Sequence, residues 1–220
     1  MKRSEVNAAI VEAVNLLTEF KWSLPLWADW SEKDYALEPK TSEYLRTHQM
    51  GWDVTDFGSG TFATRGLTLF CLRNGVQTNK KMIPYAEKLM FINESQETPF
   101  HHHRVKMEDI INRGGGNLMV EFCHEDPSDE RIIQVMVDGC IRPITPHQPL
   151  RLSPGQSVTM QRRLYHRFYA ESGHGMVLGG EVSQVNDDSG DNYFLEELGR
   201  FSTIEEDVAP LYPLWNEVGK

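Results

Sequence analysis

Residues 99–116 read PFHHHRVKMEDIINRGGG, and this stretch is the strongest indication of a fold and a site in the chain. On a β-strand successive side chains alternate between faces, so His101 and His103 point to one side and His102 to the other. Glu108 follows five residues after His103, far enough for the chain to turn and return a carboxylate to the same pocket. Two neutral imidazoles and a carboxylate suit Mn, Fe, Co, Ni or Zn and leave coordination positions for substrate or water. The pattern predicts a divalent metal site, although three adjacent histidines also occur as an exposed polar cluster.

Short apolar runs lie on both sides of this stretch. We expect strands at residues 67–72, 85–92, 118–122, 133–137, 150–160 and 176–185. Turn formers such as Asn74-Gly75, Gly114-Gly115-Gly116 and Asp138-Gly139 separate them, and Pro154-Gly155 makes a tight turn inside one of them. Many short strands without a long helix between them predict an antiparallel sandwich or barrel.

The first sixty residues have a different pattern. Ser4 and Glu5 are typical of a helix N-cap and first turn, and apolar residues then recur at helical spacing through Phe20. Residues 22–52 are irregular and predict short helices and loops packed on a sheet. We therefore expect a mainly β protein with one structural domain, in which an N-terminal helical or irregular extension (1–60) packs on a barrel (61–220). The acidic tail after Asp187 is expected to wrap around the outside of that barrel.

Composition restricts the kinds of partner. The chain has 220 residues, with 22 basic against 32 acidic side chains and a net charge of -10, which disfavours nucleic acid. Cys71, Cys123 and Cys140 are widely spaced, which favours a reducing compartment, and each is expected to be a buried strand residue. The sequence has no long apolar run and no signal-peptide pattern, so we expect a cytoplasmic protein without a membrane partner.

The spacing of the first motif resembles that of the cupin superfamily, whose fold is a small β-barrel of the jelly-roll type. The match is His101-x-His103, four residues, Glu108, six residues, Gly115, with Ser95 where a glycine usually opens the motif. Pro154-Gly155 resembles the second motif loosely. The resemblance implies His166 as a fourth ligand, although it follows eleven residues after the glycine, later than in cupins.

Longer blocks of sequence resemble one cupin family, the D-lyxose isomerases. These blocks are GWDVTDFG (51–58), GLTLFCLRNG (66–75), YAEK (85–88), H-x-H-x-x-K-x-EDIINRGGGN (101–117), LRLSPG (150–155), LYH (164–166) and GEVSQVNDDSGDNYF (180–194). The resemblance spans most of the chain. It implies interconversion of D-lyxose and D-xylulose, and often of D-mannose and D-fructose, with Mn²⁺ as cofactor and Co²⁺, Fe²⁺ or Zn²⁺ as other candidates. The resemblance to cupins also implies a homodimer.

This reaction moves a proton between C1 and C2 through an enediolate, which a divalent cation stabilises. The family resemblance makes Lys106 and Glu181 the candidate proton-handling groups, and which of them is the base stays open. Glu181 follows two glycines in an apolar strand, which suggests close approach of a ligand. Lys88, Asp188 and Asp191 are the candidate substrate-binding residues, although a run of acids is also typical of a solvated loop.

Two other functions fit the same ligand set. An iron-dependent cupin dioxygenase would use three histidines and a glutamate to hold Fe(II) for a small thiol or diketone. A non-catalytic cupin would only bind a sugar. The acid-rich segment GEVSQVNDD favours a polyol, and the pair Lys106 and Glu181 favours a catalyst, since a pure binder needs no acid and base.

Overall fold

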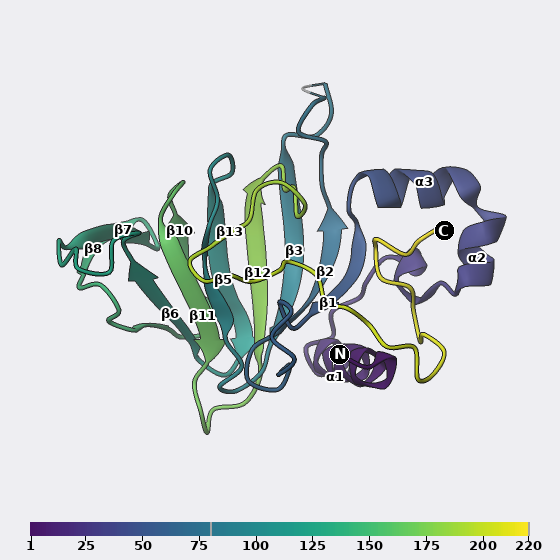
Figure 1. Cartoon of the computed structure of the whole chain (residues 1–220), viewed down its shortest axis with the longest axis horizontal. Helices are drawn as coiled ribbons and strands as arrows, with labels where there is room; N and C mark the ends of the chain where they lie inside the picture. The colour runs from purple at the N-terminus through teal and green to yellow at the C-terminus, as the bar shows by residue number, and fades with distance from the viewer. Residues whose placement is uncertain (80, 220) are drawn as a thin grey trace.

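Two antiparallel β-sheets face each other in the computed structural model, which describes residues 1–79 and 81–219 (Figure 1). The larger sheet has the order β1 (Gly51–Thr55), β2 (Leu67–Arg73), β3 (Tyr85–Ile92), β12 (Val177–Gln184), β5 (Glu108–Gly115), β10 (Ser157–Met160), β7 (Ile133–Val137) and β8 (Cys140–Ile144). The smaller sheet has the order β13 (Tyr193–Phe194), β4 (Thr98–His102), β11 (Tyr165–Ala170), β6 (Leu118–Cys123) and β9 (Leu150–Leu152). The expected mainly β, cupin-type barrel is confirmed.

The main apolar core lies between the two sheets. Side chains from both inner faces interdigitate there, including Ile110 and Val158 from the larger sheet and Val120, Phe122 and Phe168 from the smaller one. Each of these is at most 3% exposed, so the core excludes water along the length of the barrel. The strands that carry the site therefore stand on a rigid, packed base.

Two turns predicted from the sequence have the backbone conformation that they need. Gly155, between β9 and β10, has a φ of +93°. Gly115 has a φ of +86°, and a Cβ there would lie 2.2 Å from the carbonyl oxygen of Met176. Ser95 replaces the usual opening glycine of the motif and still adopts a φ of +56°, in the left-handed region that glycine favours.

A second apolar layer covers the outer face of β1, β2 and β3. The helix α1 (Arg3–Glu19) packs Val6 and Ile10 against Trp52, Phe70 and Phe91. The helix begins two residues earlier than expected. Its N-cap is Lys2 instead of Ser4, and the backbone N–H of that residue donates to the Glu5 carboxylate at 2.7 Å.

Strand β1 is a feature that the sequence did not predict. Its five residues are all buried, because one face meets the barrel and the other meets α1. A strand buried on both faces lacks the polar and apolar alternation that marks a half-exposed strand. Residues before position 60 thus contribute the edge of the larger sheet.

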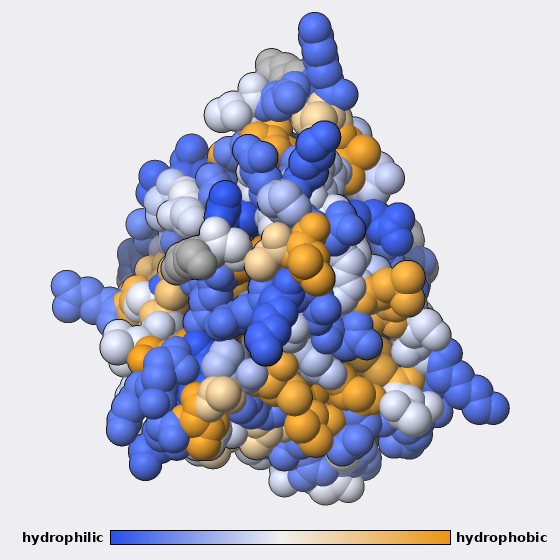
Figure 2. All heavy atoms as spheres, turned by 90° about the vertical axis from the view of Figure 1, so that its right-hand side faces the viewer, coloured by the Kyte–Doolittle hydropathy of each residue, from blue (hydrophilic) through white to orange (hydrophobic). Residues whose placement is uncertain are grey.

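The rest of the N-terminal region forms η1 (Leu26–Asp29), α2 (Glu32–Leu37) and α3 (Pro39–Thr47), which lie beside β1 together with the chain's C-terminal tail (Figure 1). The tail forms backbone hydrogen bonds with β1 and with α1. The N–H of Trp215 in the tail donates to the carbonyl oxygen of Trp52 in β1, and the N–H of Arg3 in α1 donates to the carbonyl oxygen of Glu205 in the tail. Figure 2 shows this end of the molecule, where polar side chains predominate and apolar ones form separate patches.

The cysteines correct one expectation. Cys71 and Cys123 are buried on β2 and β6, but Cys140 is exposed. Cys140 begins β8, an edge strand that follows the turn at Asp138-Gly139 and is exposed over most of its length. None of the described helices is long and apolar enough to cross a membrane.

Candidate metal centre and substrate pocket

Four buried side chains converge at one end of the barrel. His101 on β4 lies directly across the strand pair from His166 on β11, and His103 follows β4 immediately. Glu108 opens β5 in the opposite sheet, so the set bridges both sheets. Each residue offers one ligand atom, and these atoms all lie within 4.8 Å of one another. The predicted set of four residues is therefore assembled as a group that could hold a metal ion.

The three imidazoles are oriented by backbone carbonyls. Each Nδ1 lies at hydrogen-bond distance from a carbonyl oxygen: Pro99 for His101 (2.8 Å), Leu164 for His166 (3.0 Å) and Asp191 for His103. A carbonyl only accepts, so each Nδ1 carries the proton and each Nε2 keeps its lone pair. Burial and the neighbouring imidazoles hold the pKa of His101 well below its usual value, which favours the neutral, ligating form.

Two ligand atoms in this group lack hydrogen-bond partners. Glu108 Oε1 lies 3.2 Å from His103 Nε2 and 3.1 Å from His166 Nε2. Among the described residues, neither Glu108 Oε1 nor His166 Nε2 has a hydrogen bond of suitable geometry, and both atoms are buried. Buried polar atoms without partners are costly, and a divalent cation between them would satisfy both. The donor set, nitrogen with one carboxylate oxygen, fits such an ion.

Next to this group, Lys106 joins two carboxylates. Its Nζ lies 2.7 Å from Glu108 Oε2, 2.7 Å from Glu181 Oε1 and 3.0 Å from Asn186 Oδ1. Burial alone would lower the pKa of Lys106, but the two carboxylates raise it above its usual value. Burial would raise the pKa of Glu181, but Lys106 and Lys88 lower it. The lysine is therefore a cation and Glu181 an anion at neutral pH.

Lys88 extends this chain of charges across the larger sheet. It pairs with Glu181 in the register of β3 and β12, so the two side chains share one face. Its Nζ lies 3.5 Å from Glu181 Oε2 and 3.6 Å from Asp188 Oδ1. The neighbouring Glu87 turns outward to Arg73. Burial opposes ionisation of Asp188, but Arg200 and Lys88 lower its pKa below the usual range.

Asp191 does not have the position expected of a substrate-binding residue. Its carboxylate accepts hydrogen bonds from the backbone N–H groups of Arg104, Val105 and Lys106. It is absent from the pocket wall. The carboxylate is directed at the turn between His103 and Lys106 because that turn presents three N–H groups which no strand partner satisfies. Asp191 thus holds the turn in place.

The glycines before Glu181 also differ from expectation. The sequence suggested that they admit a ligand, but the side chain of Arg113 crosses Gly180, where a Cβ would lie 2.8 Å from Nε. Gly179 faces Met90 and Ile92, with a Cβ at 3.1 Å from the nearer side chain. These glycines accommodate neighbouring side chains instead of a substrate.

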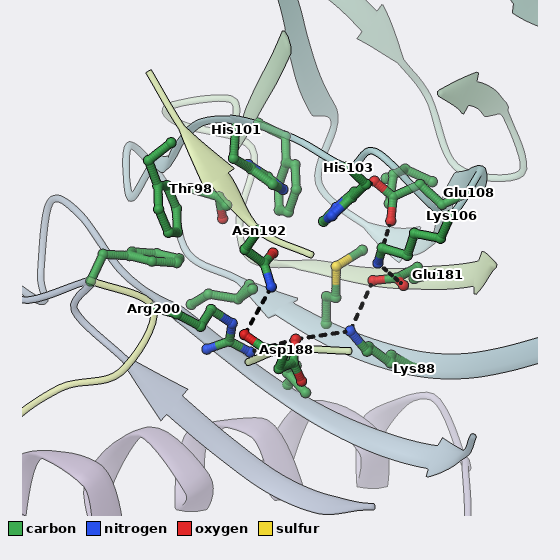
Figure 3. Close-up of a pocket in the computed structure, with 17 residues that line it drawn as sticks. Lys88, Thr98, His101, His103, Lys106, Glu108, Glu181, Asp188, Asn192 and Arg200 are labelled. Atoms are coloured by element: carbon green, nitrogen blue, oxygen red, sulfur yellow. Dashed lines mark hydrogen bonds and ion pairs between the residues drawn. The ribbon is translucent and has the colours of Figure 1, made fainter. Parts of the chain in front are cut away.

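The ligand group opens onto a small pocket between the two sheets. Its apolar wall consists of Phe57, Leu67, Leu69, Met90, Ile110, Phe168 and Phe194. Its polar wall adds Lys88, Thr98, Glu181, Asp188, Asn192 and Arg200 to the metal-binding end. Figure 3 shows Arg200 and Asp188 on the side of the pocket away from His101 and His103. None of the tryptophans lines this pocket, and Trp52 packs in the core instead.

Sequence reasoning missed Arg200, Thr98 and Asn186. Arg200 lies in the tail, in the unremarkable context LGRFST, and no spacing connects it to the motif. Simple strand alternation places Thr98 on the face opposite to His101, three residues later. The pairing of β4 with β11 is irregular between Phe168 and His166, so alternation does not hold there. Asn186 lies inside the block GEVSQVNDD, so the family resemblance was the one signal that could have found it.

Comparison with known proteins places the chain among sugar isomerases. The model of the D-lyxose isomerase family matches residues 1–218. A D-lyxose/D-mannose isomerase of Escherichia coli O157:H7 is 44% identical over 222 aligned residues, which cover 99% of this chain and 98% of that protein. A protein of the same name from Serratia proteamaculans is 45% identical and covers 99% and 97%.

Solved structures with a similar fold are more distant in sequence. The L-ribose isomerase of Cellulomonas parahominis, solved with L-ribose, has a TM-score of 0.62 at 15% identity and covers 93% of this chain and 98% of its own. The L-ribose isomerase of Acinetobacter sp. DL28 has a TM-score of 0.63 at 16% identity, with the same coverage. These structures support the fold.

Proposed function

The chain belongs to the D-lyxose isomerase family, and we propose that it is a metal-dependent aldose–ketose isomerase that interconverts D-lyxose and D-xylulose. D-mannose and D-fructose are the second substrate pair, as the names of both curated relatives suggest. The observation that carries the proposal is a pair of buried ion contacts made by Lys106. They connect Glu108, a candidate metal ligand, to the anionic carboxylate of Glu181 in one pocket.

Mn²⁺ is the proposed metal, with His101, His103, Glu108 and His166 as its ligands. When bound, a divalent cation supplies positive charge beside the C1 and C2 oxygens, where negative charge develops during isomerisation. Co²⁺, Fe²⁺ and Zn²⁺ suit the same nitrogen and oxygen donors, so elemental analysis decides between them.

Glu181 is the proposed base that moves the proton between C1 and C2. It is held as an anion by Lys106 and Lys88, and its carboxylate lies in the pocket wall. A carboxylate on one face of the substrate can take the proton from one carbon and return it to the next. Lys106 orients this carboxylate, with Nζ 2.7 Å from Glu181 Oε1. To donate a hydrogen bond to a substrate oxygen, Lys106 would release one of its three present contacts, such as the one with Asn186 Oδ1 at 3.0 Å.

The charges in the pocket favour an unphosphorylated sugar. Each cation in the wall already contacts a carboxylate: Lys106 contacts Glu181, and both Lys88 and Arg200 contact Asp188. A phosphate group would have to compete with those carboxylates. The buried Thr98 Oγ1, which has no hydrogen-bond partner among the described residues, and the amide of Asn192 suit hydroxyl groups. We propose Lys88 and Asp188 as groups that bind the sugar.

An assay with supplied metal separates this proposal from its alternatives. Purified protein loaded with Mn²⁺ is expected to convert D-lyxose to D-xylulose, and elemental analysis of the same sample gives the metal content. Oxygen consumption with Fe²⁺ and a small thiol or diketone would indicate the dioxygenase instead. Sugar binding without turnover or oxygen uptake would indicate the binding protein.

A cytoplasmic homodimer is the proposed state of the protein. Cys71, Cys123 and Cys140 are all free thiols, which suits a reducing compartment. Leu26 and Leu37, on η1 and α2, are 87% and 79% exposed, and such apolar side chains favour a contact with a second copy. Light scattering of the purified protein tests the dimer.

A further inference from the structure

Arg200 is a buried guanidinium with unused hydrogen-bonding capacity. Its side chain is 10% exposed, and its Nη2 lies 2.6 Å from Asp53 Oδ2 and 3.2 Å from Asp188 Oδ1. Its Nη1 is buried and has no hydrogen-bond partner within the described part of the chain. An unsatisfied buried N–H group costs free energy, and Arg200 is one of the residues that line the substrate pocket. A ligand in the pocket would supply the missing acceptor.

The guanidinium is held in a fixed position. Asp53 comes from β1 and Asp188 from the loop after β12, and both bind the same nitrogen. The guanidinium cannot rotate without disturbing both ion pairs. Figure 3 places Arg200 on the far side of the pocket from His101 and His103. A sugar with C1 and C2 at the candidate metal centre would extend its other end toward Arg200.

We propose that Arg200 Nη1 donates a hydrogen bond to a hydroxyl group of the sugar remote from C1 and C2, on C4 or C5, and so selects the substrate. The inference rests on the proposed function, because it takes C1 and C2 to lie beside the metal ligands. Arginine has no acceptor, so the partner must be an oxygen with a free lone pair. Asp53 and Asp188 already balance the charge of Arg200, which favours a neutral hydroxyl over an anion.

A cycle of enzyme and substrate changes tests this inference. The wild type and Arg200→Lys are each assayed on D-lyxose, 4-deoxy-D-lyxose and 5-deoxy-D-lyxose with Mn²⁺. The lysine keeps a positive charge beside Asp53 and Asp188 but cannot place a second N–H at the Nη1 position. For one of the two deoxy sugars, the wild type is expected to lose about 10- to 100-fold in kcat/KM, as for a lost hydrogen bond to a charged group.

The expected result for Arg200→Lys is a similar loss on D-lyxose and no further loss on that deoxy sugar. Arg65→Lys is the matched control, since Arg65 pairs with Glu97 and Glu196 outside the pocket, and it should keep the wild-type discrimination. Asp53→Asn loosens Arg200 without removing it. Asp53→Asn should also reduce the discrimination between D-lyxose and the deoxy sugar. It replaces Arg200→Lys as the test variant if Arg200→Lys does not fold.

Each contrary outcome has a separate meaning. If the wild type does not isomerise D-lyxose, the proposed function fails and this inference fails with it. If the wild type isomerises D-lyxose but both deoxy sugars react equally well, only the role of Arg200 is overturned. The role of Arg200 is also overturned if the loss in kcat/KM from Arg200→Lys multiplies with the loss from the missing hydroxyl group. Two effects that multiply are independent, and independent effects exclude a direct contact.

Discussion

The ammonium group of Lys106 lies 2.7 Å from the carboxylate of Glu181, and both side chains are buried in the pocket wall. This contact stabilises the anionic form of Glu181 despite its burial. The proton-handling roles proposed for the two residues therefore depend on one ion pair.

Replacing Glu181 with glutamine is expected to lower kcat by about 10²- to 10⁴-fold, because the amide cannot accept the carbon-bound proton. Metal content should stay at the wild-type level, since Glu181 is not in the ligand group. Solvent deuterium incorporation into the sugar checks the proton transfer directly. Glu87→Gln, on the neighbouring strand with its side chain turned to Arg73, is the control and should keep full activity. Unchanged deuterium incorporation in Glu181→Gln would move the role of base to another group.

Replacing His166 with alanine is expected to reduce metal content and to abolish isomerisation. The change removes one of the four ligand atoms of the group. Elemental analysis after dialysis measures the outcome, with His174→Ala as the control because that side chain is 46% exposed and lies outside the group. Full metal stoichiometry in His166→Ala would show that the fourth ligand is misassigned.

Removal of the metal from the wild type is expected to abolish activity reversibly. A chelator should abolish the isomerisation of D-lyxose, and added Mn²⁺ should restore it. The melting temperature should fall on chelation, because an ion that binds only the folded state stabilises it. Activity that persists in metal-free protein would contradict the proposed role of the cation.

Replacing Asp191 with alanine is expected to weaken metal binding by about 10- to 100-fold, the range for residues that orient metal ligands. The change frees three backbone N–H groups in the turn between His103 and Lys106. Titration with Mn²⁺ measures the affinity, and Asp187→Ala in the same loop is the control. If Asp191→Ala instead raised KM for sugar at unchanged metal affinity, Asp191 would bind substrate after all.

Replacing Asp188 with asparagine should change how stability depends on pH. The folded protein holds the pKa of Asp188 below its unfolded value, so its contribution is present above about pH 3.9 and is lost as the pH falls toward the folded pKa. At neutral pH the variant should be less stable by about 1–3 kcal/mol, and the difference should shrink in acid. Urea unfolding of metal-free samples measures both values. A difference that is constant with pH would mean that the carboxylate charge contributes nothing.

Much of the fold and part of the site followed from local patterns. Alternation along a strand predicted that His101 and His103 share a pocket face while His102 lies outside it, where its ring stacks on Tyr193. Turn chemistry predicted the positions of Asp138-Gly139 and Pro154-Gly155. Strand β1 and the exposed Cys140 were missed, because burial on both faces or on neither leaves no periodic signal.

By itself the sequence determined the mainly β architecture, the pair of histidines with Glu108, and membership of a family that implies His166, Lys106 and Glu181. The tertiary structure decided which charged groups meet. Lys106 and Glu181 are 75 positions apart, and Arg200 and Asp53 are 147 apart. It also turned Asp188 into the pocket and Asp191 toward backbone N–H groups. Strand alternation and turns act over a few residues, whereas these contacts depend on the order of strands in two sheets and on the path of the tail.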